Sequence, residues 1–476
     1  MNKLYQNIGF YGLLVTGIFF IGWWLTANPV RDLSVSEPGM DNRGAGNAYI
    51  QDVDIGEIFN EIGSHSNQLT GKWPRFRGAD LDNISKSDID LIDRFRDSVP
   101  DIMWSVELGE GHAGAAIYEG IVYILDYDEE NEADLLRSFD LVTGEEIWQR
   151  GYHVHVKRNH GKSRTTPAIT DDYILTMGPK AHVMCVNRTD GSFRWGINLE
   201  KDYKTEIPMW YTGQCPLIDD GVAVIASCGT SLMLGVDCET GEVIWETPNP
   251  KGWKMSHASV MEMEFAGKRM YVYAAIGAAF GISAEGQDRG QILWVTEEWR
   301  HDVVAASPVC MPDGVVFLSA AYGTGCMAIQ LRESGEGIVT EIIDEYMPGE
   351  GLAAEQQTPI YYEGHLYSIL PKYAAALRNQ FVCVDPSNLR EMVWTSGKTA
   401  RFGLGPYILA DGKFFILSDD GVLTIARAST DDYIQLDQAN VIENGQDAWA
   451  PIAYADGYMV LRDSKTMVCI SLKKTG

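Results

Sequence analysis

A small residue, a Gly six positions later and a Trp four positions after the Gly recur four times along this chain of 476 residues. The four stretches are SFDLVTGEEIW (Ser138, Gly144, Trp148), CVNRTDGSFRW (Cys185, Gly191, Trp195), GVDCETGEVIW (Gly235, Gly241, Trp245) and AEGQDRGQILW (Ala284, Gly290, Trp294). Successive Trp residues lie 47, 50 and 49 positions apart, which is the period of a four-stranded propeller blade. In such a blade the Gly makes the tight turn before the outermost strand, and the Trp packs over the small residue and joins adjacent blades. The repeat therefore predicts an all-β propeller.

The rest of the sequence completes a ring of eight blades. Turn-flanked runs of apolar and β-branched residues predict seven of them, at 109–152, 160–200, 209–250, 253–299, 301–348, 351–398 and 401–442. The eighth blade begins at Asp447. It is split, because its Trp, Trp104, comes from the other end of the repeat region. Closing the ring with strands from both ends removes the open sheet edges. Cys185, Cys383 and Cys469 occupy the small-residue position, which favours a buried structural role for them.

These repeats, together with the W-P-x-F-R-G motif at residues 73–78, resemble the tryptophan-docking repeats of the PQQ-like eight-bladed β-propellers, where PQQ is pyrroloquinoline quinone. The resemblance extends from Trp73 to the C-terminus. This quinoprotein/BamB-like family includes alcohol dehydrogenases and a non-enzymatic propeller of outer-membrane assembly. The motif is most similar to that of the membrane-anchored W-P-x-F-R-G members. The resemblance implies an architecture, whereas the function has to be argued from a site.

The N-terminal segment is expected to anchor the protein in a membrane. Residues 8–25 hold no charged side chain, and Trp23 and Trp24 lie where an interfacial aromatic belt is expected, so we expect residues 1–25 to form a transmembrane anchor. A cleaved signal peptide is the alternative, although the Thr-Ala-Asn-Pro sequence after Leu25 is a poor cleavage site. The family resemblance places the remainder in the periplasm or otherwise outside the cytoplasmic membrane. These observations predict a single-pass membrane protein.

Residues 26–100 are expected to form a tether between this anchor and the propeller, which is expected to occupy residues 101–476. Apolar residues at helical spacing predict two short helices in the tether, near residues 54–62 and 87–96. The first helix is expected to dock on its own propeller, on the membrane or on a partner.

The charge and the cysteines exclude several classes of function. A net charge of −28 argues against nucleic acid and anionic lipid surfaces as partners. The eight Cys residues form no C-x-x-C pair, so neither a thioredoxin-like site nor covalently attached haem is indicated. Disulfides between Cys215 and Cys228, or between Cys310 and Cys326, stay open as alternatives.

Function in propellers concentrates at one mouth of the central channel. Aligning the blades places six polar or aromatic residues near that mouth as candidates for binding a cofactor: His112, Arg164, Gln214, His257, Gln357 and Trp449. Ordinary lining of a water-filled channel is the alternative interpretation. PQQ requires cations for its carboxylates and an aromatic surface for stacking, which Arg164 and Trp449 would supply. Calcium requires several oxygen ligands, and Asp302, Glu355 and Asp447 show no such arrangement in the sequence.

A second candidate is the sequence His153-Val-His155-Val-Lys157-Arg-Asn-His160 between the first two blades. Alternation along a strand puts His153 and His155 on one face, as a metal or haem site would require. No Cys or carboxylate set accompanies them at ligand spacing, which favours a solvated basic edge or a docking patch. We therefore assign no metal ligand and no catalytic residue.

Two functions are compatible with this sequence. The first is an exported, membrane-anchored scaffold that binds other envelope or membrane proteins, with no cofactor. The alternative is a quinoprotein dehydrogenase that uses PQQ and calcium. The anchor, the tether and the missing calcium set favour the scaffold, so the protein is expected not to be an enzyme.

Overall fold

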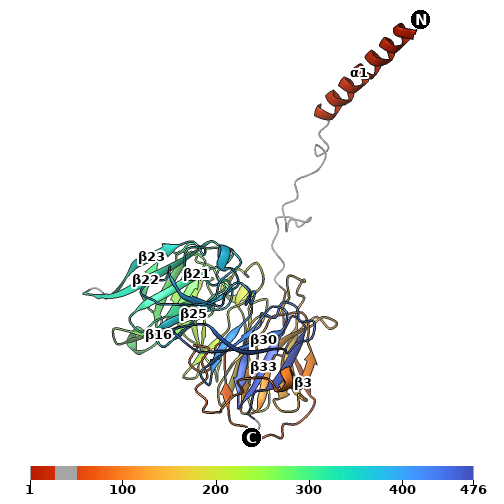
Figure 1. Cartoon of the computed structure of the whole chain (residues 1–476). Helices are drawn as coiled ribbons and strands as arrows, with labels where there is room; N and C mark the ends of the chain where they lie inside the picture. The colour runs from red at the N-terminus through yellow and green to blue at the C-terminus, as the bar shows by residue number, and fades with distance from the viewer. Residues whose placement is uncertain (1, 27–50, 336, 475–476) are drawn as a thin grey trace. The chain divides into compact units, whose positions relative to one another are not determined.

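The computed structural model describes residues 2–26, 51–335 and 337–474. The chain divides into two compact units, residues 1–50 and 51–476. The first contains helix α1 (Asn2–Thr26), and the second contains the β-structure (Figure 1).

Helix α1 covers the apolar run for which a membrane anchor was predicted. In the described part of the chain, no helix is long and apolar enough to cross a membrane. This finding overturns the predicted transmembrane anchor over residues 1–25, and with it the single-pass localisation based on that anchor.

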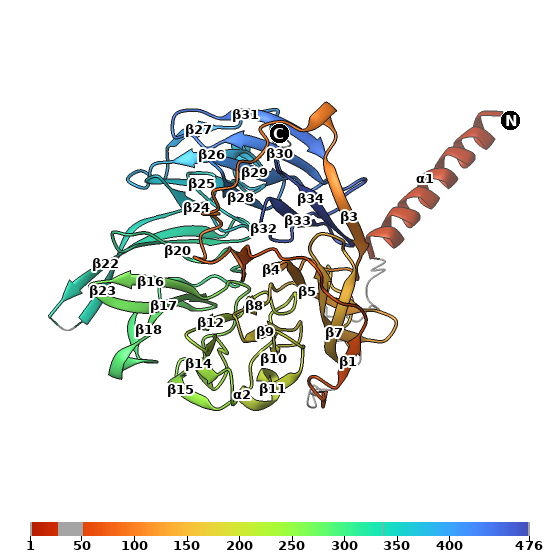
Figure 2. The same ribbon diagram turned by 90° about the horizontal axis from the view of Figure 1, so that it is seen from below.

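Eight sheets follow one another around a ring in the second unit, one for each blade (Figure 2). Blades 1 and 2 contain β4 (Ala116–Tyr118), β5 (Ile121–Asp128), β6 (Ala133–Asp140), β7 (Glu146–His153), β8 (Ala168–Ile169), β9 (Tyr173–Met177), β10 (His182–Asn187) and β11 (Phe193–Asn198). Blades 3 and 4 contain β12 (Leu217–Asp219), β13 (Val222–Ile225), β14 (Ser231–Asp237), β15 (Val243–Pro248), β16 (Met261–Phe265), β17 (Lys268–Ala275), β18 (Ala278–Ser283) and β19 (Ile292–Thr296). A short helix, α2 (Leu199–Tyr203), follows β11.

The second half of the ring has the same plan, with antiparallel neighbours ordered from the inner to the outer strand. Blades 5 and 6 contain β20 (Val309–Cys310), β21 (Val315–Ala320), β22 (Gly325–Ser334), β23 (Gly337–Tyr346), β24 (Ile360–Tyr362), β25 (His365–Ile369), β26 (Phe381–Val384) and β27 (Met392–Thr395). Blade 7 contains β28 (Tyr407–Ala410), β29 (Lys413–Leu417), β30 (Val422–Arg427) and β31 (Ile434–Asn440). Blade 8 contains β32 (Ala453–Ala455), β33 (Tyr458–Arg462), β34 (Thr466–Ser471) and, from the other end of the repeat region, β3 (Asp101–Glu107). The predicted eight-bladed propeller, closed by strands from both ends, is confirmed.

Four Trp residues join their blades to the following ones, as predicted: Trp104, Trp148, Trp195 and Trp245. Trp195 lies opposite Cys185 in its own blade, and Trp104 lies opposite Cys469. Each ring also rests on the turn Gly of the following blade, so that a Cβ on Gly241 would lie 2.7 Å from the Trp195 ring. All eight Cys residues are free, so neither disulfide alternative is formed.

Blade 4 departs from the predicted spacing. Trp294 lies opposite Gly281, and not opposite Ala284. The 3-10 turn η2 (Gly286–Asp288) lengthens the connection before β19, which moves the pairing by three positions.

The segment between residues 51 and 100 packs on the ring. The helix predicted near residues 54–62 is wrong: β1 (Ile58–Glu61) is an edge strand that pairs with β7. The helix predicted near residues 87–96 is also wrong, because this stretch is irregular and leads into the 3-10 turn η1 (Arg96–Ser98). Free backbone groups at the outer edge of blade 1 favour a strand for β1, although its apolar spacing also fits a helix.

Candidate functional site

Residues 72–85 cross one end of the central channel. The short strand β2 (Lys72–Trp73) pairs with β4 of blade 1. The segment then forms hydrogen bonds with inner strands or adjoining residues on both sides of the ring: Pro74 with Ile169, Arg75 with Ile218, Arg77 with Thr358 and Pro359, and Asn83 with Tyr407 and Leu409. These partners belong to blades 2, 3, 6 and 7. The W-P-x-F-R-G motif therefore begins a segment that spans the channel, which we call the channel plug (residues 72–85; Figure 2).

Arg77 holds the channel plug in place. Its side chain is 3% exposed. The guanidinium donates hydrogen bonds to four backbone carbonyls, at 2.7 Å to Leu81, 3.2 Å to Asp82, 2.8 Å to Thr358 and 3.1 Å to Pro359. Burial lowers the pKa of Arg77 to about 10, so the group remains charged at neutral pH.

A cavity of about 380 Å³ opens within the channel mouth and reaches Phe76 of the channel plug. Five of the six predicted mouth residues line it together: His112, Arg164, His257, Gln357 and Trp449. The sixth, Gln214, is buried outside the lining, where its amide forms two hydrogen bonds of 2.9 Å with the backbone of Ala226. Gln214 thus supports the start of blade 3. A role in binding stays a prediction for the other five.

Several lining residues were missed by the blade alignment because they lie on connections between strands. The most important are Trp210, Tyr322 and Lys372, whereas the lining residue Glu355 had been considered from the sequence as a calcium ligand. Tyr322 is marked in the structure by backbone strain, since positive φ is costly for bulky side chains and concentrates at functional sites. Among the described residues, the ring-bearing residues with positive φ are His160, Tyr211 and Tyr322, and all three lie in or beside this mouth.

Four polar atoms around the cavity are buried without a hydrogen-bond partner: Nδ1 of His112, Nε of Arg164, Nε2 of His257 and Oε2 of Glu355. An unsatisfied buried polar atom costs about 1–3 kcal/mol, so four of them in one cavity indicate a place where a ligand or ordered water completes the hydrogen bonds. Of the four side chains, His112 is 8% exposed and Glu355 is 5% exposed.

The cavity is cationic although the protein is strongly acidic. Arg164 donates to the backbone carbonyls of Asn159 and His160, and no carboxylate of the described residues pairs with it. Burial, together with the charge of Arg164, lowers the pKa of His112 to about 3 and that of His257 to about 4, so both imidazoles are neutral near pH 7. Burial raises the pKa of the Glu355 carboxyl, and Lys372 opposes that shift.

Aromatic rings face the cavity from opposite sides of the ring of blades. On the side of blades 3 to 5, the Trp210 ring lies 5.4 Å from that of Tyr322 and 5.9 Å from that of His257. On the side of blades 8 and 1, the Trp449 ring lies 5.0 Å from that of His112. The Trp449 indole is fixed by a 2.8 Å hydrogen bond from Nε1 to Asp419.

Comparison with known families identifies the chain. The family model described as outer membrane protein assembly factor BamB matches residues 101–208 and 131–356, which together cover more than half of the chain. The chain belongs to the BamB family. No curated protein matches it.

Solved structures similar to this BamB-family chain include both branches of the predicted resemblance. BamB from Moraxella catarrhalis is 10% identical with a TM-score of 0.51, over 78% of this chain and 100% of that chain. A quinohemoprotein alcohol dehydrogenase, ADHIIG from Pseudomonas putida HK5, is 13% identical with a TM-score of 0.57, over 85% and 81% of the two chains. At these identities the similarity establishes the shared fold alone.

Two side chains of the histidine sequence at the end of blade 1 lie against carboxylates of the same chain. Nδ1 of His153 lies 2.8 Å from Glu57, and Nδ1 of His155 lies 2.9 Å from Glu132. Within the residues that the structure covers, no group of three or more His, Cys, Asp or Glu side chains is placed to hold a metal ion. The interpretation as a solvated edge accounts for these contacts.

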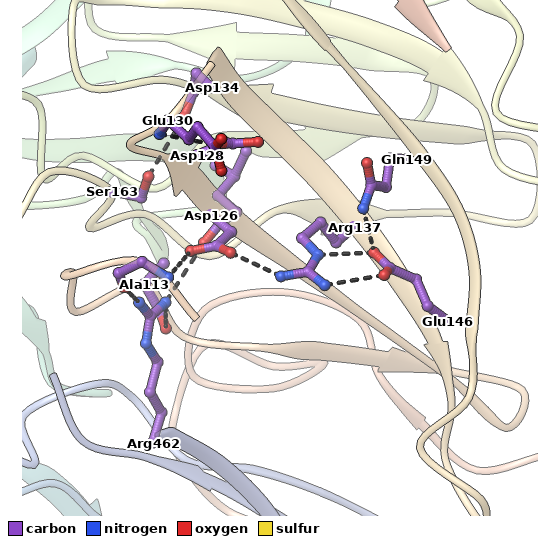
Figure 3. Close-up of polar contacts among 12 residues, drawn as sticks. Ala113, Asp126, Asp128, Glu130, Asp134, Arg137, Glu146, Gln149, Ser163 and Arg462 are labelled. Atoms are coloured by element: carbon purple, nitrogen blue, oxygen red, sulfur yellow. Dashed lines mark hydrogen bonds and ion pairs between the residues drawn. The ribbon is translucent and has the colours of Figure 1, made fainter. Parts of the chain in front are cut away.

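A buried polar network joins blade 8 to blade 1 (Figure 3). Arg462 of β33 donates to the Gly109 carbonyl at 2.8 Å, and Asp126 accepts from Arg137 at 2.8 Å. Arg137 also forms a two-pronged contact with Glu146. Asp134 lies near this network, where it accepts hydrogen bonds from Tyr152 and Ser163.

Asp134 is expected to make stability depend on pH. Burial raises its pKa to about 7, against the opposing hydrogen bonds from Tyr152 and Ser163. Because this folded-state pKa exceeds the unfolded value of about 4, the contribution is fully present below about pH 4 and is lost as the pH rises through 7. In the parent, this group should lower the free energy of unfolding by on the order of 2–4 kcal/mol between pH 4 and 8, as measured by denaturant unfolding. In Asp134→Asn, which has no titrating carboxyl, that decrease should be absent. The exposed Asp172→Asn is the control, and equal pH profiles for parent and Asp134→Asn would contradict the expectation.

Proposed function

We propose that this BamB-family propeller is a non-catalytic interaction scaffold that binds partner proteins along the outer strands of blades 3 to 6. The observation that carries the proposal is a series of aliphatic side chains, each 37–52% exposed, on four consecutive outer strands. They are Val243 and Ile244 on β15, Ile292 and Val295 on β19, Val339, Ile342 and Ile343 on β23, and Val393 on β27. We call them the outer-strand surface. Exposed aliphatic groups gathered on one side of a protein are typical of interaction sites.

Blade 5 is the centre of this surface. Its strands β22 and β23 have ten residues each, and the hairpin extends away from the ring (Figure 1). A β-bulge opposite Ala328 and Ile329 leaves Ile343 without a pairing partner, so that Ile342 and Ile343 are both exposed.

The chain itself demonstrates that such an outer edge accepts another strand. In blade 1, β1 pairs with β7, and the guanidinium of Arg150 lies 4.1 Å from the centre of the Phe59 ring. The same kind of edge in β23 carries the aliphatic groups, whereas two of its acidic residues, Glu341 and Asp344, already form ion pairs with Arg332 and Arg390 of this chain. A partner that suits it is therefore an extended, apolar segment, bound by strand addition. The family description as an assembly factor supports this function.

Site-specific photo-crosslinking tests the proposal. A crosslinking amino acid at position 342 or 295 should capture a defined partner in cells, whereas one at position 102, on the outer strand of blade 8, should not. With the purified partner, Ile342→Lys combined with Ile343→Lys should weaken binding at least tenfold. Ile102→Lys, which changes an equally exposed side chain, is the matched control. Equal capture at positions 102 and 342, or unchanged affinity of the double variant, would refute the proposal.

The alternative, a dehydrogenase that uses PQQ and calcium, fits the cavity less well. PQQ has three carboxylates, whereas the cavity offers one half-buried cation, Arg164, and the exposed Lys372, which is near Glu355. Glu355 is the single carboxylate side chain in the lining, and Asp302 and Asp447 lie outside it. A calcium ion requires six to eight oxygen ligands, which this lining does not supply. We therefore derive no catalytic step from this site.

A further inference from the structure

We infer that the channel-mouth cavity binds a flat aromatic ring that carries a single carboxylate, either as a small free acid or as the C-terminal aromatic residue of a peptide. This site is separate from the outer-strand surface, so it stands or falls independently of the scaffold proposal. Its volume of about 380 Å³ lies within the range of about 300–1,000 Å³ that is usual for small-ligand pockets.

Arg164 is the observation from which we infer a carboxylate on the ligand. Two of its hydrogen bonds go to backbone carbonyls, and its Nε is buried with no acceptor. A guanidinium edge matches the two oxygens of a carboxylate, and the pair is strengthened where water is excluded. The neighbouring His112 and His257 are neutral. Lys372, the other cation of the lining, is exposed and lies near Glu355, so among the described residues Arg164 is the lining cation without a carboxylate partner.

The aromatic side chains on the two opposite walls of the cavity are the observation from which we infer an aromatic ring on the ligand. Trp210 and Tyr322 on one side and Trp449 on the other present surfaces on which a flat ligand stacks. Arg164, on blade 2, lies between these walls. A ring that stacks on either wall can therefore direct its carboxylate to the Arg164 side chain.

The buried Glu355 lies across the cavity from Arg164, on the approach to blade 6. Its Oε2 has no hydrogen-bond partner in the structure. Burial raises the pKa of the Glu355 carboxyl, which provides a polar contact for the ligand on the side away from the ligand's carboxylate.

Calorimetric titration of the full chain tests this inference with two matched pairs of probes. Indole-3-acetate is compared with indole-3-acetamide, and a pentapeptide with a C-terminal Trp is compared with its C-terminal amide. At least one acid should bind saturably and at least tenfold more tightly than its amide. Binding by indole-3-acetate identifies a small acid as the ligand, whereas binding by the free-carboxylate peptide alone identifies a chain terminus.

Substitution of Arg164 distinguishes recognition of the carboxylate from non-specific binding of the aromatic probe. Arg164→Gln should abolish the preference for acid over amide, whereas Arg300→Gln, at an exposed position, should retain it. If Arg164→Gln does not fold, as judged by its melting curve, Arg164→Lys replaces it. That variant keeps the charge without the guanidinium edge, and should weaken binding of the acid at least threefold. Absence of binding by both acids, equal binding of acid and amide, or an unchanged preference in the Arg164 variant would overturn the inference.

Discussion

Replacing Trp195 by Ala should lower the free energy of unfolding by about 3–5 kcal/mol. Trp195 is 8% exposed. Its Nε1 donates to the Cys238 carbonyl of the next blade at 2.9 Å, and its ring covers Gly241 of that blade. The substitution therefore creates a cavity between blades 2 and 3 and removes a hydrogen bond that joins them. Equilibrium unfolding in denaturant measures the loss.

Trp24→Ala is the matched control, because it removes the same side chain from an exposed position in the other compact unit. The β-sheet transition should be the same in this variant as in the parent. Gly241→Ala provides a second check, since its Cβ would approach the Trp195 ring to 2.7 Å at a positive φ. Its cost should be smaller when Trp195 is already Ala. A Trp195→Ala protein that unfolds like the parent would contradict the assigned contact between the blades.

The propeller was predictable because its stabilising contacts repeat within about 50 residues. Each Trp signals both a strand pair and an inter-blade contact, and the pair Trp195 and Cys185 lies only ten positions apart. Closure of the propeller was also predictable from the sequence. The C-terminal strands of blade 8 have no outer-strand Trp of their own, and Trp104, near the start of the repeat region, supplies it. The error at Ala284 arose from the local turn η2, which changes the pairing without changing the spacing of Gly and Trp.

The candidate site was only half predictable. Residues such as His112 and His257 lie at equivalent positions before the inner strands, so alignment of the blades finds them. Trp210 and Tyr322 lie on connections that do not repeat, and so no alignment finds them. The predicted helix near residues 54–62 failed for a related reason. Its apolar spacing suits a helix, but the edge of β7, almost a hundred positions later, determines that Ile58 and its neighbours form a strand.

The channel plug was not predicted at all, although its W-P-x-F-R-G motif was noted. Arg77 contacts Thr358, which is 281 positions away in the sequence. A single motif without a repeat gives no indication of so distant a partner. The motif therefore identified a family resemblance but not its structural role, which is to span the channel and contribute Phe76 to the cavity.

Replacing Arg77 by Met should lower the free energy of unfolding by at least about 3 kcal/mol. The change leaves three buried carbonyls and the partly buried Asp82 carbonyl without their donor, and each unsatisfied buried group costs about 1–3 kcal/mol. Met retains much of the apolar volume of the side chain, so the loss of hydrogen bonds dominates. Denaturant unfolding measures the change. Arg75→Met, in the same motif, is the control, because Arg75 is half-buried and donates to one carbonyl, that of Ile218.

Hydrogen exchange separates loss of the channel plug from general destabilisation. The amides of Ile169 and Leu409 donate to Pro74 and Asn83 of the plug, in blades on opposite sides of the ring. Both amides should exchange faster in Arg77→Met than the loss of global stability alone predicts. The amides of β14, which does not contact the plug, should change only as much as global stability predicts. If the exchange rates of all these amides change by the same factor, Arg77 stabilises the ring as a whole. In that case the plug is held by its backbone pairing with β4 and with Leu409, and the guanidinium is not what keeps the channel closed.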